Sequence, residues 1–177
     1  MSNPTPTSSG LFATLLPHVA YVTVRGKANL ALADSIKSFG CQVAKENEAD
    51  LVIDLAPCTG LDSTFMGVLV GIVHAFQHRS KHTVALTNVS LLLQDQLSTL
   101  GLNQMVGCYA PEEVPDPFHP IVPPDQLSPL ERSQADQPQT ARMMLTAHQN
   151  LADLSAENQA RFKDVIDLLQ QDQEPDT

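Results

Sequence analysis

Glycine and proline divide this chain into three parts. All eight glycines lie at or before Gly107, and eight of the thirteen prolines lie between Pro111 and Pro138. Neither residue occurs from Thr140 to Gln171. Because proline fixes φ and lacks a backbone donor, residues 111–138 can form neither a helix nor a central strand, and an extended linker is predicted there. The last part is rich in Ala, Leu and Gln, which predicts helices.

The part before the prolines alternates between strand and helix patterns. Short β-branched or apolar runs predict strands at 18–25, 50–55, 82–88 and 104–109, with a further candidate at 11–16. Apolar residues at helical spacing predict helices at 29–39, 63–78 and 90–100. Gly26 is expected to end the strand at 18–25, and Gly40 is expected to end a helix that Asn29 caps. The alternation predicts an α/β fold, with a mostly parallel mixed sheet of about 4–5 strands packed by helices.

These patterns set the expected domain limits. Residues 1–10 lack the charged and apolar segments of a signal peptide and are predicted to be a disordered lead-in. The α/β domain is expected at 11–110, the linker at 111–138, a helical extension at 139–171 and a disordered tail at 172–177. Ser155 is a good N-cap, so the extension is predicted to be two helices, at 139–153 and 155–171. It can pack on the chain's own domain, or serve as an arm for homodimerisation or partner binding.

Charge argues against one large class of partner. Residues 1–110 carry six Lys and Arg against seven Asp and Glu, a net of −1, and the rest of the chain carries −9. Neither part offers the basic patch that nucleic acids require. The longest mostly apolar run, 65–76, is too short to cross a bilayer, and the three widely spaced cysteines show no zinc pattern. We therefore expect a cytoplasmic protein without membrane insertion, metal or cofactor.

The turn after the strand at 50–55 is the first place to look for a site. In parallel sheets, sites lie at the carboxyl ends of strands, where helices begin. Here Asp62-Ser63-Thr64 precedes an apolar helix. Each of these residue types is a good helix cap, and capping alone is the simplest interpretation of the triplet.

The wider context of the triplet points to a known family. A buried strand ends in Asp54-Leu55, a short loop follows, and Asp62-Ser63-Thr64 then leads into Met66-Gly67 and Leu69. This stretch resembles the signature of STAS domains in bacterial anti-sigma-factor antagonists. The segment 24–29, with a strand, a glycine and a helix start, is similar to the family as well. The resemblance covers about 100 residues and does not extend to the helical extension.

The resemblance implies a function without catalysis. In this family the serine after the aspartate is phosphorylated by a histidine-kinase-like anti-sigma factor, and a PP2C-type phosphatase removes the phosphate. By position Ser63 is the expected acceptor, Thr64 is the second choice, and residues 62–66 are the expected partner-binding segment. A helix N-terminus tolerates a phosphate, whereas a docked partner would have to desolvate it, so the switch would act on the interface.

One departure from the family and two other functions complete the predictions. Phe65 stands where the family has glycine, which places a large apolar side chain among Asp62, Ser63, Thr64 and Met66 on the expected docking surface. The first alternative is a constitutive STAS scaffold or transporter-associated subunit without phosphorylation. The second is a hydrolase, which would need a base near Ser63.

The histidines on the predicted helix after Ser63 do not supply that base. His74 and His78 follow Ser63 by about three and four turns of the same predicted helix, so they cannot reach it. They share a helix face, as a metal site would need, but solvated histidines at a helix end are the simpler interpretation.

Overall fold

A computed structural model describes residues 9–79 and 81–173, although nothing is described of the Arg79 side chain. Most of the predicted disorder, at 1–8 and 174–177, falls outside these residues. The strands are β1 (Gly10–Leu16), β2 (Val19–Ala28), β3 (Asp50–Asp54), β4 (Cys58–Leu61), β5 (Val84–Thr87), β6 (Gly107–Cys108) and β7 (Ser128–Pro129). The α-helices are α1 (Leu30–Glu46), α2 (Ser63–Arg79), α3 (Leu91–Thr99), α4 (Gln137–Ala152) and α5 (Ala156–Gln171). Short 3-10 helices occupy Leu102–Gln104, Asp116–Phe118 and Pro124–Gln126.

The strands form one mixed sheet in the order β6-β5-β3-β2-β1-β7, with β4 paired to the end of β2. β2, β3, β5 and β6 run parallel, whereas β1 and β7 are antiparallel to their neighbours. The α/β class and the mostly parallel sheet are therefore confirmed. The sheet has seven strands rather than about five, because β4 and β7 are too short to show a strand pattern. Pro129 is tolerated in β7 because that strand lies at the sheet edge.

Two glycines do not act as the sequence predicts. β2 continues past Gly26, which has a φ of 73°, and residues 26–28 pair with β4, with a register shift between Gly26 and Lys27. Gly40 lies inside α1, which runs on to Glu46 and ends at the left-handed residue Asn47. A side chain at position 40 would meet Ile72 of α2, so Gly40 permits close helix packing instead of ending the helix.

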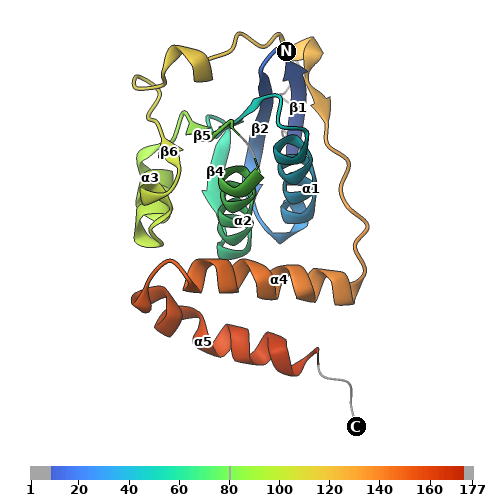
Figure 1. Ribbon diagram of the computed structural model, residues 1–177, viewed down its shortest axis with the longest axis vertical. Coiled ribbons are helices and arrows are strands. Elements are labelled where there is room, and N and C mark those ends of the chain that lie inside the picture. Colours follow the sequence, from blue (N-terminus) through green and yellow to red (C-terminus); the bar gives the residue numbers. More distant parts are fainter. Residues whose placement is uncertain (1–8, 80, 174–177) are drawn as a thin grey trace, which may run out of the picture.

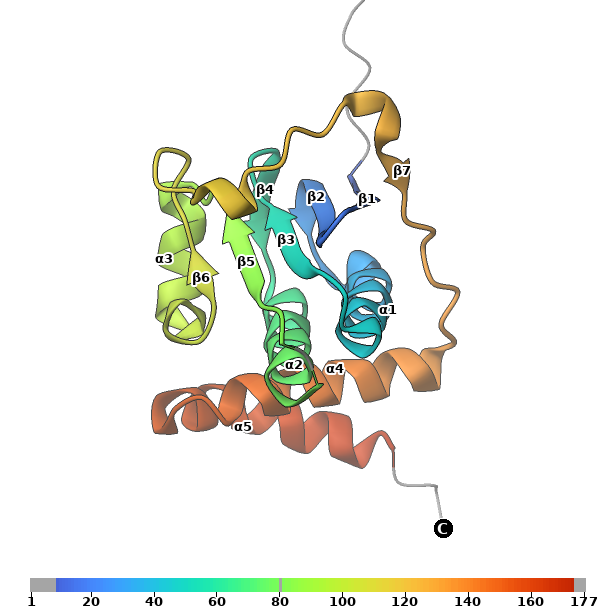
Figure 2. The same cartoon turned by 45° about the horizontal axis from the view of Figure 1, so that its top comes forward.

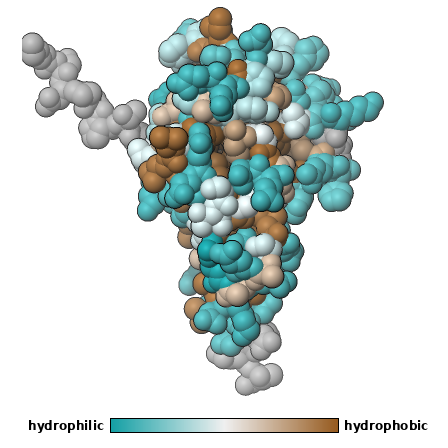
Figure 3. All heavy atoms as spheres, turned by 90° about the vertical axis from the view of Figure 1, so that its left-hand side faces the viewer, coloured by the Kyte–Doolittle hydropathy of each residue, from teal (hydrophilic) through white to brown (hydrophobic). Residues whose placement is uncertain are grey.

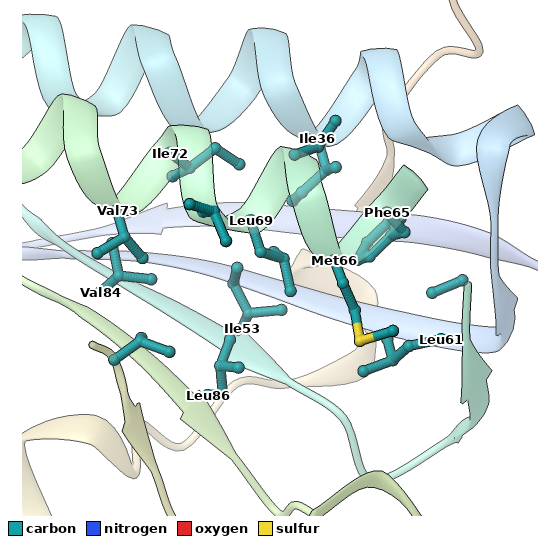
Figure 4. Packing of buried hydrophobic residues seen from close by; sticks show 14 of the residues in the cluster. Ile36, Ile53, Leu61, Phe65, Met66, Leu69, Ile72, Val73, Val84 and Leu86 are labelled. Carbon is teal, nitrogen blue, oxygen red and sulfur yellow. The ribbon is translucent and has the colours of Figure 1, made fainter. Parts of the chain in front are cut away.

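The elements stack in layers. Figure 2 shows the sheet, then α1 and α2 side by side beneath it, then α4, and then α5 farthest from the sheet. Buried side chains of α1, α2 and the strands fill the space between the first two layers, and Figure 4 shows Ile36, Ile53, Leu69 and Ile72 among them. Figure 3 shows the arrangement from the α3 side: a wide body carries the sheet, and the α4–α5 pair forms the narrower part below it.

The proline-rich segment connects this domain to the C-terminal helices as an ordered strap. Figure 1 shows it passing over the top of the sheet and down beside α1 to the start of α4. The strap is anchored to α1 because the Ser35 hydroxyl donates to the carbonyl of Glu131 at 2.8 Å and accepts from the amide of Ser133 at 3.3 Å. The extension itself forms two helices, and Ser155 caps the second through the amide of Asn158. Within residues 9–79 and 81–173, no helix has the length and apolar character to cross a membrane.

Candidate functional site

The loop before α2 begins at Asp54, the last residue of β3. The Asp54 carboxylate accepts hydrogen bonds from the Tyr21 hydroxyl at 2.7 Å, from the Asn88 amide at 2.7 Å and from the backbone of Ala56 at 3.0 Å. Asp54 is only 8% exposed, so these three bonds compensate the burial of its charge. Burial, with the bond to Asp54 as a second cause, raises the pKa of Tyr21 far above its usual range. The network fixes the point from which the loop leaves the sheet.

Asp62 is the residue that caps α2. One of its carboxylate oxygens accepts from the amide of Phe65 at 2.8 Å, and the other accepts from the amide of Leu30 at 3.0 Å. A single side chain therefore holds the first turns of both α2 and α1. Ser63, the first residue of α2, is left free of the capping role that the sequence allows for it.

The hydroxyl of Ser63 instead meets a histidine from the C-terminal extension. The Oγ atom of Ser63 lies 3.2 Å from Nε2 of His148, and Nδ1 of His148 lies 2.7 Å from the carbonyl oxygen of Met144. A carbonyl can only accept, so Nδ1 carries the proton. In the neutral imidazole, Nε2 is then the acceptor and the Ser63 hydroxyl donates to it. Ser63 is half-buried, and His148 is 4% exposed.

Sequence reasoning missed His148, because 85 positions separate it from Ser63 and no local pattern links the two. A weak signal was present. His148 lies four residues after Met144 and three before Leu151, on the apolar stripe of its helix, where a polar residue needs a buried partner. His74 and His78 do not supply a contact to Ser63. The part of the chain that the structure describes contains no group of three potential metal ligands.

The residues after Ser63 point into the core. Thr64 is 5% exposed, Met66 is 6% exposed and Phe65 is completely buried. Figure 4 shows Phe65 and Met66 lying between the α2 ribbon and its neighbours. The expectation that Phe65 lies on a docking surface is therefore wrong, because its ring fills the core beneath α1. Of the predicted partner-binding segment, only Asp62 and Ser63 keep partly exposed side chains.

α4 approaches this part of α2 very closely. A Cβ atom at Gly67 would collide with the carbonyl oxygen of Ala147. The side-chain amide of Asn150 donates to the carbonyl of Gly67 at 3.1 Å, one turn of α4 from that contact. Of the two roles that the sequence left open for the extension, the structure has α4 packed on the chain's own domain.

Comparisons with known proteins agree with this architecture. The sequence model of the STAS domain matches residues 13–114, which is more than half of the chain. A STAS-domain anti-sigma-factor antagonist from Planctomyces limnophilus superposes with a TM-score of 0.50 at 16% identity, covering 59% of this chain and 92% of its own.

Two further solved structures are similar. An anti-sigma factor antagonist from Mycobacterium paratuberculosis has 20% identity, a TM-score of 0.49 and coverage of 59% and 88%. Unphosphorylated SpoIIAA, also an anti-sigma factor antagonist, has 13% identity, a TM-score of 0.49 and coverage of 58% and 89%. A search of curated proteins gave no match. By the match of its sequence over residues 13–114, the chain belongs to the STAS domain family.

Proposed function

We propose that this chain is a regulatory interaction module of the anti-sigma-factor-antagonist type, switched by phosphorylation of Ser63. The observation that carries the proposal is the division of roles at the start of α2. Asp62 caps the helix with its carboxylate, so the Ser63 hydroxyl takes no part in the cap and its modification would not remove the cap. Thr64 is the poorer acceptor because its side chain is buried.

A phosphate on Ser63 would change the surface and preserve the fold. The first amides of a helix and its dipole favour an anion at that end. Residues 1–110 carry a net charge of only −1, so a phosphate of about two negative charges would change the charge of this part to about −3. A partner that binds over the unmodified serine would have to desolvate that charge, so we expect the phosphorylated form to release it.

The partners follow from the family. The kinase would be a histidine-kinase-like anti-sigma factor, and the phosphatase would be of the PP2C type, both in the cytoplasm. The test is incubation of the full chain with a candidate kinase of this class and ATP, followed by peptide mass spectrometry. We expect one phosphate on Ser63, lost in Ser63→Ala and kept in Ser38→Ala, an exposed serine of α1. Equal phosphorylation of Ser63→Ala and the unmodified chain would disprove the assignment.

The contact with α4 favours a second candidate, a constitutive STAS scaffold. A serine already covered by its own chain need not be a switch. The two functions differ in one measurement, the affinity for a kinase-like partner of Ser63→Asp against that of the unmodified chain. The switch predicts a loss of at least about tenfold, or 1.4 kcal/mol, and the scaffold predicts no change.

The contact between Ser63 and His148 favours a hydrolase as a third candidate. His148 is the base near Ser63 that such a reaction would need. Its Nδ1 donates to a backbone carbonyl, however, and a carboxylate that would stabilise an imidazolium is absent from that position. Treatment with a fluorophosphonate tests this candidate. Labelling of Ser63 that His148→Ala abolishes would establish an activated serine, and an unlabelled chain would reject it.

A further inference from the structure

The stripe of α2 that carries Ser63 is built for close contact with another helix. Ser63, Gly67 and Gly71 follow each other at intervals of four, so they lie along one face of α2. Glycine weakens the interior of a helix relative to alanine, so two glycines on one face indicate that space is needed there. A side chain at Gly67 would collide with the backbone of α4, and one at Gly71 would touch only the end of Asn150.

α4 makes three contacts with two residues of this stripe, Ser63 and Gly67. His148 meets the Ser63 hydroxyl, Ala147 lies against Gly67, and Asn150 donates to the carbonyl of Gly67. Two of these contacts are hydrogen bonds from polar side chains. The same face of α4 also buries Met143, Ala147 and Leu151, so opening the interface would expose apolar side chains together with these polar groups.

The contact between α2 and α4 is tight around Ser63 and Gly67 and looser near Gly71. Beside it, between α1, α2 and α4, lies a cavity of about 270 Å³ lined by Cys41, Gly71, His74, Met143 and Thr146 among others. α4 therefore fills the α2 surface closely around Ser63 and leaves space nearer the middle of α2. α4 is nevertheless anchored along its length, because Met143, Ala147 and Leu151 are all buried.

The rest of the extension supports α4 from its outer side. The ring of Phe162 in α5 lies 5.5 Å from that of His148. The side-chain amide of Asn158 donates to the carbonyl of Leu100 at 3.0 Å and to the carbonyl of Leu151 at 2.9 Å. α5 therefore links α4 to the end of α3. Figures 1 and 2 both show α4 crossing beneath α2, with the strap as its only connection to the STAS domain along the chain. The strap is held to α1 at Ser133, three residues before Asp136, the N-cap of α4.

We infer that α4 is an intramolecular occupant of the partner-binding face of α2, so that α4 and α5 must swing away before another protein reaches Ser63. The inference rests on the proposed function for the identity of the partner, but the covering of Ser63 can be measured without one. The C-terminal extension is then an autoinhibitory element, and its docking surface on α2 consists of Ser63, Gly67 and Gly71.

The test replaces Ser63 by cysteine in the full chain and follows alkylation of the introduced thiol by iodoacetamide, with peptide mass spectrometry to separate it from the native cysteines. Gly67→Ala is then added to push α4 away, and Gly71→Ala is the matched control on the same face. Hydrogen exchange of the α4 amides is measured in the same samples. We expect Gly67→Ala to speed both alkylation at position 63 and exchange in α4 by about tenfold or more, and Gly71→Ala to change each by less than about threefold.

Three results would overturn the inference. Exchange in α4 could rise in Gly67→Ala while alkylation at position 63 stays the same, in which case α4 does not cover the site. Exchange in α4 could stay unchanged, in which case the contact at Gly67 does not hold the helix. Alkylation at position 63 without Gly67→Ala could match that of a free cysteine peptide, in which case nothing covers the site. None of these measurements uses a kinase, so a failure of Ser63 phosphorylation would be seen separately.

Discussion

Replacing Asp62 by alanine is the sharpest test of how the site is built. The Asp62 carboxylate accepts from two backbone amides, that of Phe65 in α2 and that of Leu30 in α1. Loss of an N-cap costs about 1 kcal/mol. The amide of Leu30 is part-buried, and leaving such a donor without a partner costs about 1–2 kcal/mol. We therefore expect Asp62→Ala to lower the free energy of unfolding by about 2–3 kcal/mol.

Urea unfolding of the full chain, followed by far-ultraviolet circular dichroism, measures this loss. Asp62→Asn keeps one acceptor oxygen, so it should lose about half as much stability as Asp62→Ala. Asp34→Ala, which removes a partly exposed carboxylate of α1, controls for the change in charge. If Asp62→Ala falls within about 0.5 kcal/mol of Asp34→Ala, the two amide bonds do not stabilise the fold and the division of roles at α2 is wrong.

Three further outcomes are expected. Tyr21→Phe removes the 2.7 Å bond to Asp54 and should cost about 1 kcal/mol in the same urea assay, so an unchanged midpoint would contradict the network. Burial raises the pKa of Cys108 to about 11, so at pH 8 iodoacetamide should alkylate it about a hundredfold more slowly than free cysteine, and a rate within about tenfold would refute this. Ser63→Ala removes the hydroxyl that donates to His148, so exchange of the α4 amides should rise, and unaltered exchange would show that the hydroxyl does not hold α4.

Short-range sequence patterns predicted most of the fold. Where those predictions were wrong, tertiary packing had overridden the local signal. The alternation of strands and helices is a short-range signal, and it predicted the α/β class from residues a few positions apart. Gly40 carries the local signal of a helix end, but the fit against Ile72 keeps α1 helical past it. β4 is four residues long and contains Gly60, so no periodicity could reveal it. Its pairing with β2 is fixed only once the loop folds back.

The start of α2 at the candidate site was predictable from the sequence, and the residues that surround it were not. The aspartate and the serine before an apolar helix mark the start of α2 directly in the sequence. What surrounds them does not. Phe65 was expected at the surface because it lies in the segment that the resemblance implies for partner binding, yet the helical register turns its ring toward α1. His148 comes from an extension that the resemblance to the family does not cover, so no motif could bring it to Ser63.

The contact between Ser63 and His148 connects the two parts of the chain that the sequence separates. Because Asp62 caps α2, the Ser63 hydroxyl is not needed for the cap. It donates a hydrogen bond to His148 instead. The same glycine that belongs to the STAS signature, Gly67, is the one that lets Ala147 approach. A single turn of α2 therefore holds the proposed phosphoacceptor and the binding surface for the chain's own extension. Any partner that recognises that turn must compete with α4 for it, so the affinity measured for the full chain combines partner binding with release of α4.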